Sequence, residues 1–417
     1  MAREQSGRSA TDPGAGRLNG SNAALAEVFR EEAGRITGAL VRLLGDFALA
    51  EEAVQDAVVV ALEHWPGEGI PDRPGAWLFT VARRRALDVL RRESRFREKL
   101  TQLDWPAAQE PDDRLRLIFT CCHPTLSREA QVALTLRAVC GLTTAEIARA
   151  FVTSEATIAK RIVRARRKIV DAAIPYRVPR PDELDERLGE VLAVLYLTFN
   201  EGYLAGSGEA ATRRDLAEDA AWLTALLAAL LPGQAEVLGL LALMRLHLAR
   251  ADSRFSLHAE LVLLADQDRS RWNRRQIEEG LSLLSEAAGL NSPGVYQLQA
   301  AIVACHAESA SWEDTDWRQI VALYDALYEM SQTPVVWLNR AIAVRHLSGP
   351  AEALRALEQC AGELNGYNLY HSARAQLLGE LGDRAEERRG LARALELTTN
   401  PAERSLLKRR LADHAGE

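Results

Sequence analysis

Apolar residues recur at helical spacing along nearly the whole chain, and no stretch shows the sustained alternation of a half-buried strand. Alanine and leucine are abundant while β-branched residues are scattered, which also favours helix. The pattern begins near Asn22, after a polar tail, and is interrupted by two proline-bearing segments without periodicity, residues 100–113 and 174–183. The sequence therefore predicts an all-α protein built from several helical modules.

The first module is expected to hold an acidic-faced helix and a basic one. Between Leu49 and Trp65 alanine and valine recur at helical spacing, and the opposite face carries Glu51, Glu52, Gln55 and Asp56. The segment Pro66–Pro74 is expected to be a loop, with Trp77 opening the next helix. The apolar stripe predicted for that helix consists of Leu78, Val81, Ala82, Ala86 and Val89, and the outward basic residues are Arg83, Arg84 and Arg91.

A helix-turn-helix is predicted between Leu142 and Lys168. Thr143 with Glu146 forms a capping box, so one helix should start at Thr144 and end near Ala150. A second helix should start near Ser154, with Ile158, Ile162, Ala165 and Ile169 on its inner stripe. The opposite face is rich in basic side chains, which suit the major groove of DNA. An ordinary helical hairpin with a solvated charged face is the alternative.

The C-terminal part contains an internal repeat. A shift of 34 residues places Arg340–Ala341 on Arg374–Ala375 and Ala351–Glu352 on Ala385–Glu386. A period of this length is typical of tetratricopeptide helix pairs. The segment Gln299–Leu327 would be a third copy with an insertion around Trp312–Asp316.

Composition divides the chain in two. The 417 residues carry a net charge of −7. Residues through Val170 hold 26 Lys and Arg against 22 Asp and Glu, a net +4, whereas the remainder holds 25 against 36, a net −11. Such asymmetry indicates a nucleic-acid-binding front and a back of a different kind.

The sequence also excludes several classes of protein. No apolar run is long enough for a transmembrane helix, and the N-terminus lacks a signal-peptide core. An odd number of cysteines, five, indicates a reducing cytoplasm. Neither Cys121–His123 nor Cys305–His306 has zinc-ligand spacing, and Ser207 lies in no nucleophile elbow. We expect no metal, no cofactor and no enzymatic activity.

Together these motifs resemble a sigma factor of the extracytoplasmic-function (ECF) group. The resemblance is carried by AEEAVQDA, then PGAWLFTVARRRALDVLRR, an acidic linker, and LTTAEIARAFVTSEATIAKRIVRARRKI. Downstream, VLYLTFNEGY, LVLLADQDRSRW and VYQLQAAIVACHA resemble the subgroup with a long tetratricopeptide-like extension. The implied organisation is a tail (1–21), region 2 (22–99), an acidic linker (100–113), region 4 (114–173), a helical extension (184–290) and the repeats (291–417).

The resemblance assigns roles to particular residues. It implies that an acidic patch docks on the β′ clamp helices of core RNA polymerase: Glu51, Glu52, Gln55 and Asp56. It implies that Trp77, Arg83, Arg84 and Arg91 lie in the part that melts the −10 element and holds a flipped base. The −35 reading helix would use Thr157, Lys160, Arg161, Val163 and Arg164. The acidic linker, with Asp104, Glu110, Asp112 and Asp113, would follow the RNA path of the polymerase.

The leading hypothesis is therefore a cytoplasmic sigma factor that directs promoter recognition and carries a fused regulatory domain. Its expected partners are core RNA polymerase, promoter DNA and a peptide or protein held by the repeats. The alternative is a stand-alone helix-turn-helix regulator with a helical sensing domain. The region 2-like half distinguishes the two, because such a regulator does not need it. Trp77, taken alone, fits core packing equally well.

Overall fold

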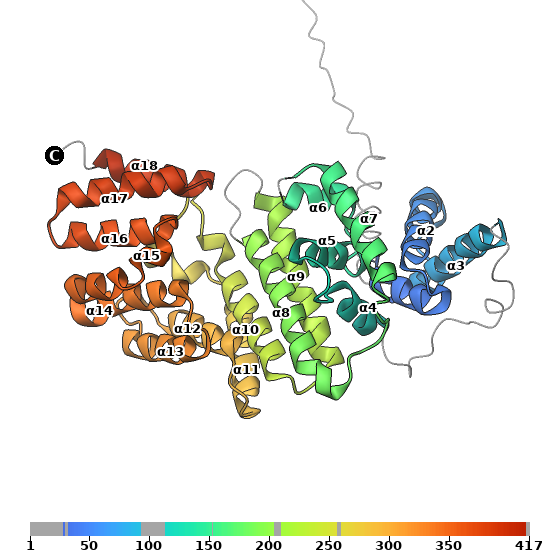
Figure 1. Ribbon diagram of the computed structural model, residues 1–417, viewed down its shortest axis with the longest axis horizontal. Helices are drawn as coiled ribbons and strands as arrows, with labels where there is room; N and C mark the ends of the chain where they lie inside the picture. Colours follow the sequence, from blue (N-terminus) through green and yellow to red (C-terminus); the bar gives the residue numbers. More distant parts are fainter. Residues whose placement is uncertain are drawn as a thin grey trace, which may run out of the picture. The chain divides into compact units, whose positions relative to one another are not determined.

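The computed structural model describes residues 28–29, 32–92, 113–151, 153–203, 210–256 and 260–413. Within these ranges the regular backbone is helical, apart from one isolated antiparallel bridge between Phe255 and Leu261, so the predicted all-α fold is confirmed (Figure 1). The chain forms two compact units, Met1–Val194 and Leu195–Glu417. The boundary lies within helix α8 (Pro181–Tyr203). The predicted tail and most of the acidic linker lie outside the described residues.

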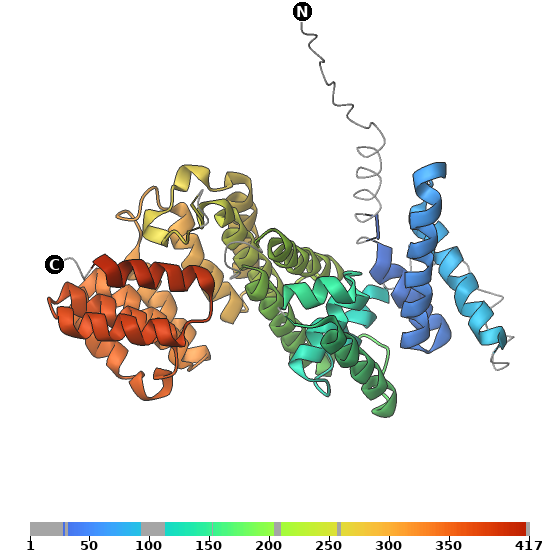
Figure 2. The same cartoon turned by 90° about the horizontal axis from the view of Figure 1, so that it is seen from above.

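Two long helices near the start of the first unit pack on each other. Residues 32–44 are helical and precede α2 (Phe47–Glu68) and α3 (Pro74–Arg92), which lie side by side (Figures 1 and 2). Asp46 caps α2 by accepting from the backbone N–H groups of Ala48 and Leu49, at 2.8 and 3.0 Å.

Both helices differ from the prediction at their ends. The helix α2 continues through Pro66 to Glu68, so the loop is shorter than Pro66–Pro74. The C-cap N–H of Gly69 still bonds to the carbonyl of Trp65, which secures the last turn. The helix α3 starts at Pro74 because proline is favoured in the first turn, where its missing N–H costs no bond.

Four shorter helices and the first part of α8 complete this unit. They are α4 (Asp113–Cys121), α5 (Arg128–Ala138), α6 (Thr144–Ala150) and α7 (Glu155–Asp171). The helix α5 packs against α4, α6 and α7. Arg187 of α8 donates to the carbonyl of Phe119 at 2.6 Å, and Arg128 pairs with Glu190 at 2.9 Å. These contacts hold α8 against the short helices.

The second unit is built around a helix that is apolar on all sides. The helix α10 (Ala235–Ala249) is buried over most of its length and packs against three neighbours: α9 (Ala210–Leu230), α11 (Arg274–Gly289) and α12 (Val295–Glu308). A segment with three 3₁₀ turns joins α10 to α11: η1 (Ala251–Ser253), η2 (Leu264–Asp266) and η3 (Arg269–Arg271). Arg269 donates to the carbonyls of His306 and Ser309, at 2.5 and 2.7 Å, and Trp272 is buried.

The 34-residue period predicted for the C-terminal part is confirmed. The helix α14 (Pro334–Glu358) is kinked at Gly349, and its second half resumes at Pro350. The helices α16 (Asn368–Glu380) and α17 (Arg384–Leu397) start 34 residues after Pro334 and Pro350, respectively. Gly349 and Gly382 supply the left-handed backbone of the two turns, with φ of 81° and 88°.

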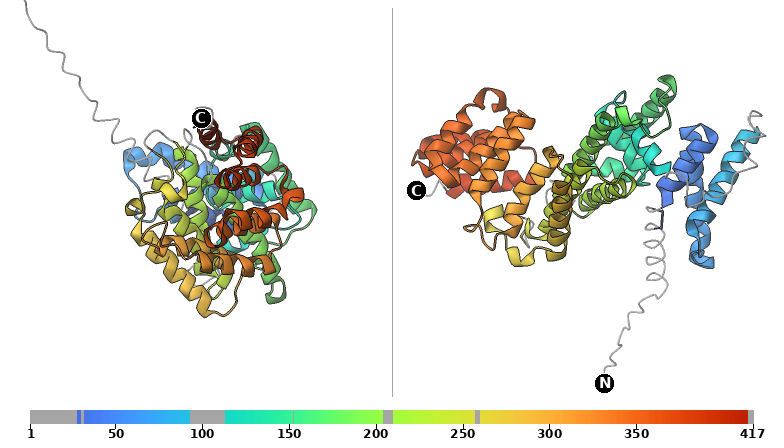
Figure 3. Two further views of the ribbon diagram at one scale, coloured as in Figure 1. Left: turned by 90° about the vertical axis from the view of Figure 1, so that its left-hand side faces the viewer. Right: turned by 90° about the horizontal axis from the view of Figure 1, so that it is seen from below.

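The helix pairs of this unit stack side by side (Figure 3). The helices α12 and α13 (Trp317–Met330) form the preceding, imperfect copy, and their longer connection includes the predicted insertion at Trp312–Asp316. The short helix α15 (Ala361–Leu364) follows α14, and α18 (Pro401–Asp413) packs on α17.

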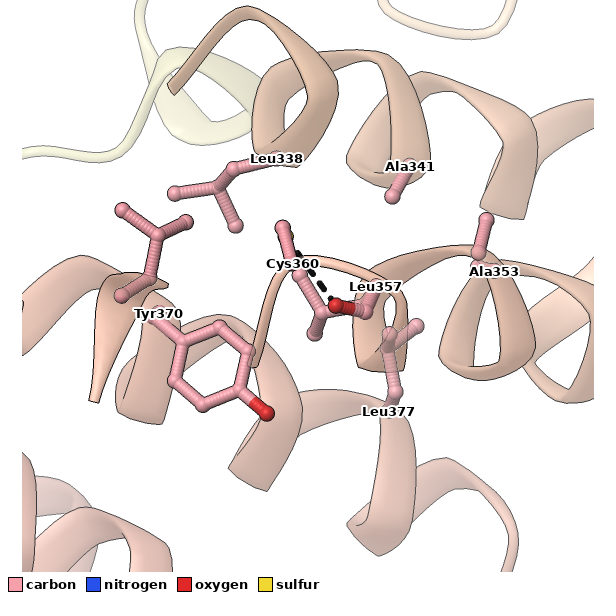
Figure 4. Close-up of a cluster of buried hydrophobic side chains, with 9 residues drawn as sticks. Leu338, Ala341, Ala353, Leu357, Cys360, Tyr370 and Leu377 are labelled. Carbon is pink, nitrogen blue, oxygen red and sulfur yellow. Dashed lines mark hydrogen bonds between the residues drawn. The ribbon is translucent and has the colours of Figure 1, made fainter. Parts of the chain in front are cut away.

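The core between the last repeats combines leucine and alanine with a tyrosine and a cysteine (Figure 4). Leu338, Leu357 and Leu377 are at most 2% exposed. The Cys360 thiol donates to the carbonyl of Leu357 at 3.1 Å, so it is satisfied without leaving the apolar cluster. Because α14 and α16 both contribute, this core fixes their spacing.

We expect Leu357→Ala to weaken the second unit by about 2–5 kcal/mol, because it empties a closed apolar site. Native-state hydrogen exchange of the α14 and α16 amides measures this loss locally. The matched control is Leu347→Ala, because Leu347 lies on the same helix and is 47% exposed. Equal protection in the two variants would contradict the prediction.

Candidate promoter and polymerase interface

A helix-turn-helix forms where the sequence predicted it. The Thr143 hydroxyl accepts from the N–H of Glu146 at 3.1 Å, and the Glu146 carboxylate accepts from the N–H of Thr143 at 2.7 Å. This capping box starts α6, which ends at Ala150. Ser154 caps α7 by accepting from the N–H of Thr157 at 3.2 Å. Both helix starts are thus set by local side-chain chemistry.

The inner face of α7 is the predicted apolar stripe. Ile158, Ile162, Ala165 and Ile169 are all buried. They fix which side of the helix faces the solvent, because residues three and four apart share one side of a helix.

The outer face of α7 carries most of the predicted reading residues. Thr157, Lys160, Val163 and Arg164 are exposed, and Arg161 is half-buried at the edge of the face. Val163 is 61% exposed although it is apolar. The outer face thus offers positive charge, a hydroxyl group and one branched apolar side chain. These are groups that read bases and phosphates in the major groove.

The predicted −10 residues lie on α3. Trp77 is half-buried and packs edge-on against Trp65, with ring centroids 5.3 Å apart. Arg83 is half-buried and Arg84 is exposed, whereas the side chain of Arg91 lies outside the described residues.

One residue of the predicted α3 stripe is misplaced. Val89 is 39% exposed, so it does not belong to the core. Phe79, which the stripe omitted, is 5% exposed and takes part instead. The predicted positions Leu78, Ala82 and Ala86 are buried, while Val81 is half-buried.

The acidic face of α2 is only partly exposed to solvent. Glu52 and Asp56 are exposed and Gln55 is half-buried, in line with a docking patch. Val59 and Leu62 extend this face toward the C-terminal end of α2 and are 54% and 45% exposed. Glu51 was predicted on the same polar face but is only 2% exposed.

Glu51 is buried because two arginines neutralise it. Arg137 of α5 donates from Nε to Oε1 of Glu51 at 2.6 Å, and Arg166 of α7 donates to Oε2. The arginine side chains are 14% and 22% exposed. Charge-assisted bonds of this kind compensate the cost of desolvating a carboxylate. Sequence reasoning missed both arginines, because they lie 86 and 115 residues from Glu51.

A second contact ties residues 32–44 to α4. Asp113 is not part of a free linker: it begins α4, is 7% exposed and pairs with Arg116 at 2.5 Å and Arg42 at 3.1 Å. The Tyr176 hydroxyl donates to the carbonyls of Gly38 and Asp113, at 2.9 and 3.1 Å. Burial raises the pKa of Tyr176, so the hydroxyl keeps the proton that it donates.

The cysteines behave as core residues. Burial raises the pKa of Cys122 to about 12, and its sulfur lies 3.4 Å from the Thr135 hydroxyl. Cys121 is equally buried, and its pKa is also raised. In the part of the chain that the structure describes, no three His, Cys, Asp or Glu side chains cluster as metal ligands. In the same residues, no helix is long and apolar enough to cross a membrane.

We expect Glu51→Gln to destabilise the first unit by about 3–5 kcal/mol, because it leaves two arginines without a carboxylate in a buried contact. Differential scanning calorimetry of the full chain would show a lower unfolding temperature. Glu52→Gln is the matched control, since Glu52 is the exposed neighbour on the same helix. A Glu51→Gln chain as stable as this control would rule out a structural role for the pair.

Comparisons with known proteins agree with this geometry. Residues 28–96 match the family model described as Sigma-70 region 2, and residues 116–169 match Sigma-70, region 4. Residues 187–288 match a Family of unknown function (DUF6596). The solved structure of yeast Tom70 is similar over 96% of this chain and 88% of that chain, but with 12% identity and a TM-score of 0.30 this likeness is too low to assign a fold.

Curated relatives fall into two groups. A Rhizobium meliloti (strain 1021) chain named "Uncharacterized protein R00370" is 42% identical over 91% of this chain and 93% of its own length. The ECF RNA polymerase sigma factor SigL of Mycobacterium tuberculosis is 34% identical over 35% of this chain and 89% of SigL. SigK of Mycobacterium sp. (strain KMS), another ECF RNA polymerase sigma factor, is 28% identical over 33% of this chain and 77% of SigK. With both sigma-70 regions present in order and most of SigL covered, this chain belongs to the ECF family of RNA polymerase sigma factors.

Proposed function

We propose that this sigma factor binds core RNA polymerase through the exposed part of α2 and reads promoter DNA through α3 and α7. The observation that carries the proposal is the outer face of α7, the second helix of the helix-turn-helix. This face is basic and exposed. Its place of action would be the cytoplasm, where the polymerase and the chromosome are found.

The −35 element is the proposed target of α7. Lys160 and Arg164 can donate to guanine edges and phosphates, and the branched side chain of Val163 suits the methyl group of thymine. Thr157 lies in the first turn, where a hydroxyl can reach a phosphate or a base. Arg161, at the edge of the face, is assigned to the DNA backbone.

The −10 element is the proposed target of α3. Arg83 and Arg84, with Arg91, would hold phosphates of the separated strands. Trp77 keeps part of its surface exposed while Trp65 supports its ring. Such a supported aromatic ring can stack an unpaired base, a contact worth about 1–3 kcal/mol.

Docking on the β′ clamp helices is assigned to Glu52, Gln55 and Asp56, with Val59 and Leu62 as an apolar margin. Glu51 belongs to the same proposed patch but is held by Arg137 and Arg166. A partner that engages Glu51 therefore has to part α2 from α5 and α7. We propose that this opening accompanies polymerase binding.

The second unit is proposed to regulate the first. It is a compact unit of its own, and its residues, Leu195–Glu417, hold 22 Lys and Arg against 30 Asp and Glu, a net −8 that contrasts with the basic reading face. The acidic linker is proposed to follow the RNA path of the polymerase with its residues up to Asp112. Asp113 is excluded from that role while it pairs with Arg42 and Arg116.

We expect Lys160→Glu and Arg164→Glu to lower promoter-specific transcription about tenfold or more, because each reverses a charge that faces DNA. In vitro transcription with purified core polymerase measures this, and core binding should persist. Arg275→Glu is the matched control, since Arg275 is 87% exposed on α11. The proposed function would be refuted if the full-length protein directed transcription from none of the candidate promoters.

We expect Glu52→Arg combined with Asp56→Arg to weaken core polymerase binding about tenfold, because the docking surface changes sign. Co-elution of full-length protein with core polymerase measures this affinity. Asp185→Arg is the control, since Asp185 is an exposed acid on α8. Unchanged core binding, together with retained DNA binding, would favour the stand-alone regulator instead.

A further inference from the structure

The second unit contains a cavity of about 300 Å³ within its repeats. The helices α14, α16 and α18 form three of its walls, and the segment between α10 and α11 forms the fourth through Leu261 and Leu263. The floor includes Leu338 and Leu377, which belong to the core drawn in Figure 4. The cavity is therefore based on packed, ordered helices.

The rim of this cavity is apolar and accessible. Ile342 on α14, Leu369 on α16 and Leu263 are 36%, 44% and 45% exposed. Burying these side chains against a partner would remove apolar surface from water, which is favourable. The cavity thus offers branched apolar partners on three sides.

The polar groups of the lining are mostly neutral amides or countered charges. Asn339 and Gln376 contribute side-chain amides that can donate and accept, whereas the two N–H groups of the Asn368 amide are taken by Thr398 and Glu403, which leaves its carbonyl to accept. Arg345 pairs with Glu380 at 2.5 Å, and the Asn368 amide donates to Glu403 at 3.0 Å. This lining suits the uncharged N–H and C=O groups of a peptide backbone better than a strongly charged ligand.

The fourth wall is itself a piece of extended chain. Phe255 and Leu261 form an antiparallel bridge, and the N–H of Val262 bonds to the carbonyl of Arg254 at 2.8 Å. In an extended segment, alternate side chains share one face, as Leu261 and Leu263 do here. We call the described residues 254–256 and 260–263 the strap. The strap is joined to α18 by an ion pair between Glu260 and Arg409.

We propose that this cavity binds an extended segment of a partner protein that presents branched apolar side chains at alternate positions. The strap already places two such leucines against the cavity, and the lining amides can satisfy an extended backbone. The incoming segment lies along α14 and α16 and displaces the strap from the cavity. This inference concerns the second unit and does not depend on the proposed promoter contacts.

The test is direct binding of a fluorescent peptide to the full-length chain, followed by anisotropy. The probe repeats the sequence of Glu260–Leu264 between glycine and serine flanks, and the control peptide has aspartate in place of the leucines that correspond to Leu261 and Leu263. We expect saturable binding of the probe and at least tenfold weaker binding of the control peptide.

Variants locate the site. Ile342→Glu should weaken probe binding at least tenfold, whereas Leu347→Glu, on the same helix and 47% exposed outside the cavity, should change it less than twofold. Glu260→Gln should tighten binding about two- to fivefold, because it removes an exposed ion pair that holds the competing strap. The unfolding temperature of each variant is measured to show that it is folded.

Three results would overturn the proposal. The first is that neither the wild-type chain nor Glu260→Gln binds the probe. The second is equal binding by the folded Ile342→Glu and Leu347→Glu chains. The third is self-association of the chain that Ile342→Glu abolishes and the probe does not reverse, which would assign the cavity to a second copy of the chain.

Discussion

The carboxylate of Glu51 is the constraint on which the arrangement of the first unit depends. A carboxylate that is 2% exposed is tolerable only with cationic donors in place, and Arg137 and Arg166 supply them from α5 and α7. Three helices far apart in sequence are thereby drawn to one point. The Asp113 contact with Arg42 and Arg116 repeats the principle at the start of α4. Polar pairing, besides apolar packing, thus organises the sigma half of the chain.

The two units rely on different kinds of interaction. The sigma half joins its modules through a few buried charges, and such contacts can be exchanged for those of a partner that offers equivalent charge. The repeats of the second unit join through apolar cores such as that of Leu338, Leu357 and Leu377. Ion pairs such as Arg345–Glu380 add to these cores, but separating the repeats would also expose apolar surface to water, which is unfavourable.

Local patterns predicted much of the fold and part of the candidate site. The capping box at Thr143 and the stripe of Ile158 and Ile162 are short-range features, and both lie where the sequence indicated. Glu51 could not be placed in this way, because its polar position on α2 gives no sign of partners more than 80 residues away. The prediction that Val89 is buried was wrong for a related reason. Helical periodicity indicates which side of α3 carries Val89, but it does not indicate whether another helix covers that turn. The strap was equally invisible, since only the folded chain brings Leu261 beside α16.

Arg166 gives α7, the helix with the proposed reading face, a second role. Its outer side presents Lys160 and Arg164, while Arg166 on the same rigid helix holds the Glu51 of α2. While that ion pair is intact, it holds α7 at a fixed distance from α2, on which α3 packs. Along B-form DNA each added base pair lengthens the spacer by about 3.4 Å and also rotates the next element around the axis. On the proposal that polymerase binding opens this pair, the spacing between the two proposed reading helices is then set by the polymerase and the promoter, and no longer by the ion pair.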